Sequence, residues 1–327
     1  MYLFYVVNVL ARALATEPRE RIPIGGQAVI EGVLMRGPEH WGLAVREPGG
    51  VIWRKSWRSS DWLTSPFWKL PVVRGCASMA EMMRVGMNAI SISAEKSLGE
   101  EDDMSTPMLV ASIVLAIIVV VGLFVALPMF VSDFATLRFG LSNLTKNCVE
   151  GLTRVVVFVA YVAIISLWKD MRRVFAYHGA EHKTINAYED GAEMLVESVM
   201  GYSRIHRRCG TSFMFIVIFV SIIVFSLIGS GSVLWRIGSR ILLLPLVIGM
   251  SYEFIRGASK SDTWGRICII PALLLQYITT KEPTPDQVEV ALTALKTALS
   301  QEWEFTAARE ARFEEIDNND AQSAQVV

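Results

Sequence analysis

The residues best suited to chemistry in this sequence are histidines and a cysteine in one segment of the chain. The sequence has 4 histidines, and three of them lie between positions 178 and 206. His178, Glu181 and His182 form an H-x-x-E-H string, the spacing of the inverted zinc-protease motif. If this string is helical, the two imidazoles share one face and can hold a divalent ion, and Glu181 can act as a general base.

A second pair of ligand types follows further along the chain. His206 and Cys209 are three residues apart, and imidazole with thiolate suits zinc. Four ligands on one ion would make a structural site, whereas three ligands and an open position would make a catalytic one. The sequence leaves this choice open. His206 also lies among Arg204, Arg207 and Arg208, and a basic cluster of this kind can instead contact anionic lipid headgroups.

Geometry limits whether the two pairs can meet. A straight helix continuing from Trp168 would carry His178 about 15 Å past the end of an apolar span. Cys209 directly precedes the next apolar segment. The pairs therefore converge only if the chain bends, and Gly179 is a candidate for the bend.

The composition of the chain indicates the class of protein that must position these residues. The chain has 327 residues, 52% of them hydrophobic and only 19% charged, and its mean hydropathy is +0.40. This predicts a membrane protein. Lys and Arg number 31 against 32 Asp and Glu, so no overall positive field favours nucleic acid. Four scattered cysteines do not form a disulfide framework.

Four apolar segments are long enough to be read as membrane-spanning helices. They cover residues 107–131, 152–168, 211–228 and 237–255. The apolar run at 267–278 is too short to cross and is expected to be interfacial. The predicted fold class is a polytopic α-helical membrane protein of about four transmembrane helices with a small cytoplasmic α+β portion.

Basic residues in the connections predict the orientation. Residues 169–210 carry seven Lys and Arg in the connecting loop before the third span, and residues 132–150 carry two. The positive-inside rule then places the longer loop and both termini in the cytoplasm of a multi-pass inner (plasma) membrane protein.

The sequence divides into seven segments by composition. They are an apolar N-terminal segment, a β-unit, an interfacial helix with an acidic linker, the four-helix membrane region with its 169–210 loop, an interfacial segment, a C-terminal helix and a disordered tail. Their bounds are 1–20, 21–60, 61–106, 107–260, 261–283, 284–316 and 317–327.

Local patterns predict three elements outside the membrane. Residues 28–35 read as one strand, and residues 43–46 and 51–57 as a hairpin across Glu47-Pro48-Gly49-Gly50. Residues 71–97 read as a helix lying against the bilayer or the bundle. Thr284-Pro285-Asp286-Gln287 is a helix start, and the amphipathic helix after it needs cover from the β-unit or the middle loop.

Four stretches of this sequence resemble the bacterial YqhQ-like family, the domain of unknown function numbered 1385. They are residues 24–38, 177–183, 206–213 and 276–283. The resemblance implies a metal-dependent membrane protein and supports His178, Glu181, His182, His206 and Cys209 as functional positions. It adds a second signature, Gly26, Gln27, Glu31 and Arg36.

Glu31 of this second signature is flanked by apolar residues, and if it is buried in a strand its carboxylate needs a partner such as Arg36 or a cation. Glu31 can therefore have one of two roles: it forms a structural ion pair, or its carboxylate is a third ligand of the metal.

Three functional hypotheses follow. The first is a metal-dependent hydrolase of unknown substrate, with zinc as the expected ion and Glu181 as the proton-handling group. The second is a non-catalytic scaffold or assembly factor with a structural metal. The third is a transporter, for which Glu253 and the interrupted apolar segment near Pro271 would matter most. The expected partners are the lipid bilayer and other membrane proteins, and the sequence does not determine the oligomeric state.

Overall fold

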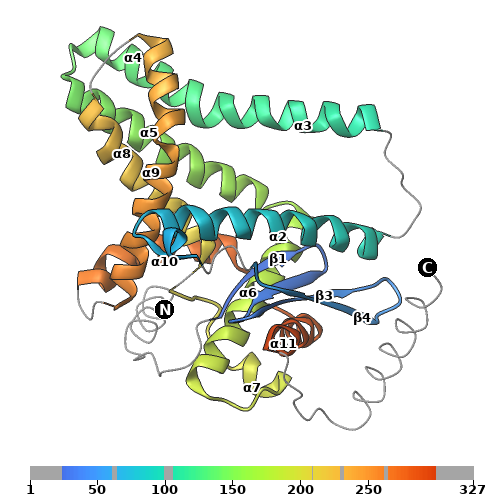
Figure 1. The fold of residues 1–327 in the computed structure, drawn as a ribbon. Helices are drawn as coiled ribbons and strands as arrows, with labels where there is room; N and C mark the ends of the chain where they lie inside the picture. The colour runs from blue at the N-terminus through green and yellow to red at the C-terminus, as the bar shows by residue number, and fades with distance from the viewer. Residues whose placement is uncertain are drawn as a thin grey trace, which may run out of the picture.

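The computed structural model describes residues 24–60, 65–98, 106–207, 209–228, 232–260 and 264–299. The described chain is mostly helical and includes one four-stranded sheet. Figure 1 shows apolar helices in the upper half of the molecule and the sheet with its covering helices in the lower half. The predicted segments 1–20 and 317–327 and the acidic linker lie outside the described residues.

The sheet is an antiparallel meander of strands in sequence order. Its strands are β1 (Gly25–Val29), β2 (Gly32–Arg36), β3 (His40–Arg46) and β4 (Ile52–Arg58). The predicted hairpin between β3 and β4 is confirmed, since Arg46 pairs with Ile52 and the Gly50 amide donates to the Glu47 carbonyl at 2.8 Å. The single strand predicted at 28–35 is wrong. The chain reverses at Glu31, whose φ of 52° lies in the left-handed region, and this divides the run between β1 and β2.

Helix α11 (Pro285–Leu299) packs on one face of the sheet and supplies most of the core there. The glutamine half of the predicted cap is confirmed, because the Thr284 amide donates to Oε1 of Gln287 at 3.0 Å, and the Gln287 amide donates to the Thr284 carbonyl at 3.0 Å. Leu292 and Leu295 are fully buried against β2, β3, α6 (Lys169–Asp190) and α7 (Val196–Met200). Both surfaces predicted to cover this amphipathic helix therefore do so.

Helix α2 (Val73–Leu98), preceded by the short helix η2 (Pro66–Lys69), covers the opposite face of the sheet. Leu34 and Leu43 of the sheet pack with Val85 and Ala89 of this helix. The predicted helix is confirmed, but a large part of its apolar surface meets the sheet. The same helix also packs on α9 (Val233–Lys260) of the apolar half, so it joins the two halves.

The apolar half contains the helices from α3 to α5 and from α8 to α10, and α6 and α7 lie between these two groups in the sequence (Figure 1). They are α3 (Thr106–Val121), the π-helical turn η3 (Gly122–Ala126), α4 (Leu127–Phe139), α5 (Asn143–Ile165), α8 (Gly210–Ile228), α9 and α10 (Trp264–Thr279). Gly140 ends α4 in the left-handed conformation with φ 64°, a common helix stop.

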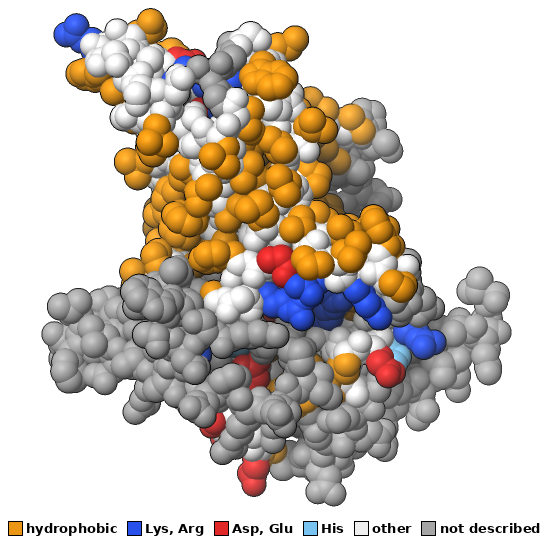
Figure 2. Space-filling view, turned by 60° about the vertical axis from the view of Figure 1, so that its left-hand side comes forward, with side chains coloured by type: hydrophobic (Ala, Val, Ile, Leu, Met, Phe, Trp, Pro, Cys, Tyr) orange, Lys and Arg blue, Asp and Glu red, His pale blue; other side chains and the backbone are white. Residues whose placement is uncertain are grey.

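Three segments of the described chain are long and apolar enough to cross a membrane. They are Val110–Phe139, Asn143–Ile165 and Leu234–Ala258. The third predicted span, at 211–228, appears as a shorter apolar helix, Ser212–Ile228. Figure 2 shows that apolar side chains cover the surface of this half and that Lys and Arg side chains gather just below it. Length and composition thus indicate membrane association.

The close packing of α11 on the sheet generates a test. A Cβ added at Gly42 of β3 would lie 2.4 Å from the Ala298 amide nitrogen and 2.5 Å from the Ala294 carbonyl oxygen, both backbone atoms of α11. We expect Gly42→Ala to lower the free energy of unfolding by about 1–3 kcal/mol, the usual cost of overpacking. Chemical denaturation of the purified protein measures this. Gly49→Ala is the matched control, since nothing lies within 4 Å of its Cβ position, and an equal loss in both variants would contradict the packing described.

Candidate metal centre

Helix α6 carries the H-x-x-E-H string and is separate from the apolar helix before it. Helix α5 ends at Ile165, the chain turns, and α6 begins with Trp168 as its N-cap. The bend needed for the histidines to reach Cys209, just before α8, is therefore at this turn. The proposed bend at Gly179 is wrong, because Gly179 lies inside α6, where a Cβ would be 2.0 Å from the carbonyl oxygen of Lys281.

Three of the four predicted ligands converge. The ligand atoms of His178, His182 and Cys209 all lie within 4.8 Å of one another. Sγ of Cys209 is 3.2 Å from Nε2 of His178. His182 and Cys209 are buried, and His178 is half-buried. A solvated pair of surface histidines would not have this arrangement.

Backbone carbonyls orient both imidazoles. Nδ1 of His178 donates to the carbonyl oxygen of Thr279 at 2.8 Å, and Nδ1 of His182 donates to that of Arg204 at 2.7 Å. A carbonyl can only accept, so each ring is neutral with its hydrogen on Nδ1, or charged. In the neutral form the Nε2 lone pair of each ring faces the cluster. Outer hydrogen bonds of this type fix the tautomer of metal-binding histidines.

The electrostatics of the cluster favour a thiolate. Burial raises the pKa of the Cys209 thiol, but the imidazoles of His178 and His182 outweigh it and hold the pKa well below its usual range. Burial lowers the pKa of His178, yet the adjacent Cys209 raises it to about 9. Thiolate and neutral imidazole are the forms that bind metal, so an ion here would displace a proton from the His178–Cys209 pair.

Glu181 lies between α6 and the sheet. It is buried, and its Oε2 atom has no hydrogen-bond partner among the described residues. A Cβ at Gly26 would lie 2.7 Å from Oε1 of Glu181, so the missing side chain on β1 makes room for the carboxyl group. Burial raises the pKa of Glu181 to about 8, with the nearby His178 opposing the rise. Its carboxyl group can therefore both hold and release a proton near neutral pH.

His206 lies beside the cluster and outside it. Its ring centroid is 5.7 Å from that of His182, and its Nε2 faces Oε2 of Glu189 at 3.4 Å. Its backbone is held by Gln276 of α10, whose side chain accepts from the His206 amide at 2.9 Å and donates to the His206 carbonyl at 2.7 Å.

The positions of Thr279, Arg204 and Gln276 were missed by sequence reasoning. Two of them act through backbone carbonyls, which carry no residue-type signal. All three bring segments distant in the sequence into contact with the histidines.

The residues of the second signature contact α6 and α2, and none of them adds a metal ligand to the His/His/Cys cluster. Nη2 of Arg173 donates to Glu31 at 2.6 Å, and Tyr177 donates to the same carboxylate at 3.1 Å. Arg36, the anticipated partner of Glu31, pairs instead with Glu81 of α2 at 2.8 Å. That expectation is wrong because Arg36 follows Leu34 on the α2 side of the sheet, whereas Glu31 faces α6.

Gln27 of the same signature also approaches α2. A Cβ at Gly86 of that helix would lie 2.6 Å from Oε1 of Gln27. With Gly26 facing Glu181 of α6, these neighbouring residues of β1 contact helices on opposite sides of the sheet.

Fold and site together define a class of protein: a mostly helical chain whose described part has three helices long and apolar enough to cross a membrane, and a His/His/Cys cluster between its apolar helices and a small sheet. Residues 70–301 match the family described as "Protein of unknown function (DUF1385)". The chain is 33% identical over 295 residues to "Uncharacterized protein YqhQ" of Bacillus subtilis (strain 168), covering 85% of this chain and 92% of that protein. The chain therefore belongs to the DUF1385 family. No solved structure matches it.

The contact between Gly26 and Glu181 can be tested by mutation. We expect Gly26→Ala to destabilise the protein by about 1–3 kcal/mol, because the new methyl group overlaps the carboxylate and the Leu34 carbonyl. Thermal or chemical unfolding measures the change. The loss should be smaller in a Glu181→Ala background, which removes one of the two overlaps.

Gly25→Ala is the control for this prediction, since nothing lies within 4 Å of the Cβ position of Gly25. Glu181 does not lie against β1 if Gly25→Ala and Gly26→Ala lower the stability equally. The same conclusion follows if the effect of Gly26→Ala is unchanged in the Glu181→Ala background.

Proposed function

We propose that this chain is an integral membrane protein that binds one divalent ion, zinc by ligand type, through His178, His182 and Cys209, and that it uses the ion for hydrolysis of an unidentified substrate. The observation that carries the proposal is the convergence of three ligand atoms within 4.8 Å, two of them on buried residues and one on the half-buried His178. The site is assigned to the cytoplasmic face of an inner membrane. The basic side chains just below the apolar surface in Figure 2 support this side, following the positive-inside rule.

The donor set fits zinc. Tetrahedral zinc has Zn–S bonds of about 2.3 Å and Zn–N bonds of about 2.0–2.1 Å, which puts sulfur and nitrogen ligands roughly 3.5 Å apart. The observed separation of 3.2 Å between Cys209 and His178 is within a few tenths of an ångström of this. In addition, Nε2 of His182 is buried without a hydrogen-bond partner in the described part of the chain, as a ligand atom awaiting a cation would be.

The number of converging ligands favours an enzyme over a structural site. Structural zinc sites use four protein ligands, and catalytic sites use three and leave one position open. Here His206, the fourth candidate, faces Glu189. A bound zinc ion would supply Lewis acidity at the open position. Glu181, three residues after His178 on the same helix, would accept or return the proton there.

A structural metal in a non-catalytic scaffold is the second candidate, and one observation favours it. The cluster joins α6 to the segment before α8, and Thr279 holds His178 from a third part of the chain. An ion would therefore also cross-link these segments. The transporter hypothesis has less support, because Glu253 is paired with Arg74 of α2, with Nε of Arg74 at 2.5 Å.

Metal analysis tests the ligand set. We expect protein purified without chelators to hold about one zinc per chain, three ligands and one ion making one site. His178→Ala, His182→Ala and Cys209→Ala should each weaken zinc binding more than about 100-fold, since outer-shell changes alone cost about 10–100-fold. Competition with a chromophoric chelator measures the affinity.

His206→Ala is the matched control for this experiment, and it should change zinc affinity by only a few fold. A metal-free wild type would reject the site. If His206→Ala loses zinc like the other three variants, His206 is a fourth ligand and the centre is closed.

Glu181→Gln separates catalysis from a structural role. The amide keeps the size of the side chain and removes its ability to exchange a proton. We expect this variant to retain zinc and to fail to restore function in a strain that lacks the gene. Restoration equal to the wild type, with zinc retained, would favour the scaffold.

A further inference from the structure

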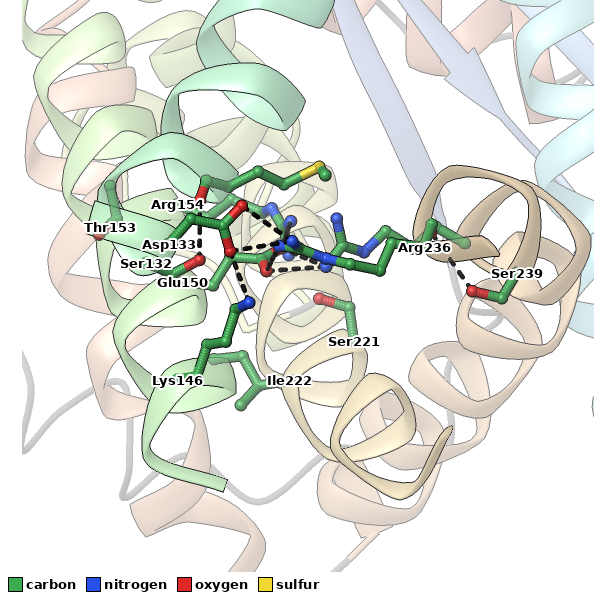
Figure 3. A network of polar contacts seen from close by, with 12 residues as sticks. Ser132, Asp133, Lys146, Glu150, Thr153, Arg154, Ser221, Ile222, Arg236 and Ser239 are labelled. Carbon is green, nitrogen blue, oxygen red and sulfur yellow. Dashed lines mark hydrogen bonds and ion pairs between the residues drawn. The ribbon is translucent and has the colours of Figure 1, made fainter. Parts of the chain in front are cut away.

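Figure 3 shows a second buried polar cluster, which joins α4, α5 and α9. These helices meet at the end of the apolar half remote from the sheet (Figure 1). Glu150 of α5 is its centre, and its side chain is only 3% exposed. Arg154 contacts this carboxylate at 2.9 Å, Arg236 at 3.2 Å and Arg240 at 2.6 Å. Three guanidinium groups therefore share one carboxylate.

A second carboxylate extends the cluster without balancing it. Asp133 of α4 accepts from Arg236 at 2.9 Å and from Lys146 at 2.5 Å. Four cations thus face two carboxylates, which leaves a surplus of two positive charges. Burying charge away from water is unfavourable unless it is paired, so this surplus calls for an anion.

The surplus charge surrounds a recess. Lys146, Arg236 and Arg240 line it, together with Asn143, Asn147 and Ser239, and Phe225 and Ile228 form its apolar wall. Nη1 of Arg240 is buried and has no hydrogen-bond partner among the described residues. The side chain of Arg236 is 9% exposed, so its charge is largely withdrawn from water. An unpaired guanidinium N–H beside this recess is a donor without an acceptor.

The shape of the recess limits what can enter it. Its volume is about 20 Å³, and one water-sized atom needs about 10–15 Å³. One or two oxygen atoms fit, whereas a whole organic ligand does not. The recess also lies near the first turns of α5 and α9, where the helix dipoles add partial positive charge.

We propose that this recess binds the oxygen atoms of a phosphate group presented from outside. Guanidinium donors match phosphate oxygens in geometry, and the surplus of positive charge matches their charge. The phosphate can belong to an anionic lipid headgroup, because the cluster lies at the end of helices that are apolar enough to span a membrane, or it can be free in solution. This site is independent of the proposed metal centre, which lies beyond the other end of α5.

Lipid binding to the full-length protein in neutral detergent tests the proposal. Native mass spectrometry would compare titration with phosphatidylglycerol against diacylglycerol, which has no phosphate. The variants are Arg240→Gln and Lys146→Gln, which each leave both carboxylates with another cation. We expect each to weaken phosphatidylglycerol binding about tenfold or more, as expected for the loss of one charged hydrogen bond.

Arg138→Gln is the matched control, because it removes the same charge from an exposed position at the same end of the bundle. It should change the affinity by less than about twofold, as expected of an exposed charge. A second measurement, the midpoint of thermal unfolding in phosphate against chloride at equal ionic strength, tests the free anion. It also shows whether each variant folds.

The outcomes are distinct. Preference for phosphatidylglycerol that both variants lose identifies a lipid headgroup. Equal binding of the two lipids, with a phosphate-dependent rise in the wild-type midpoint that both variants lose, identifies free phosphate. The proposal is overturned if the wild type shows neither a preference for phosphatidylglycerol nor a phosphate-dependent rise in the midpoint. It is also overturned if the response is the same in the wild type and both folded variants.

Discussion

The close packing of α6 is the constraint on which the rest of the structure depends. At Gly179 the carbonyl oxygen of Lys281 occupies the place of a Cβ, and at Gly26 the carboxyl group of Glu181 does the same. These approaches hold α6 between the sheet and the chain that follows α10. As a result the Thr279 carbonyl reaches His178 and the carboxyl group of Glu181 is buried. Any larger residue at either glycine would separate these segments.

Two polar centres lie at opposite ends of α5, and their unpartnered atoms indicate ligands of opposite sign. In the described chain, the atoms without partners at the His/His/Cys cluster are Nε2 of His182 and Oε2 of Glu181, which suit a cation. At the other end the atom without a partner is an N–H of Arg240, which suits an anion. Glu150 is the eighth of the 23 residues of α5, so the rest of this helix puts roughly 22 Å, at 1.5 Å per residue, between Glu150 and the helix end nearer the His/His/Cys cluster.

The second signature has a positioning role that its residue types do not reveal. Glu31 joins the β1–β2 turn to α6 through Arg173 and Tyr177, and Arg36 joins β2 to Glu81 on α2. Breaking the Arg36–Glu81 pair would leave the fully buried Glu81 carboxylate uncompensated, whereas the Glu31–Arg173 pair is more exposed and contributes little net stability. These residues therefore fix how the two helices lie on the sheet, and through α6 they fix the orientation of the histidines.

The sequence by itself determined the apolar segments, the β3–β4 hairpin, the α11 start and the three residue types of the cluster. Each depends on local spacing: runs of apolar side chains, a Pro-Gly-Gly turn, a capping pair and an i, i+4 pair of histidines. Only the tertiary structure decided that His206 faces Glu189 and not the cluster, that Glu31 pairs with Arg173, and that the chain bends before α6. It also decided that Glu150, Arg236 and Arg240 meet. These contacts join residues far apart in the chain or depend on backbone carbonyls and missing Cβ atoms, and neither leaves a pattern in a single sequence.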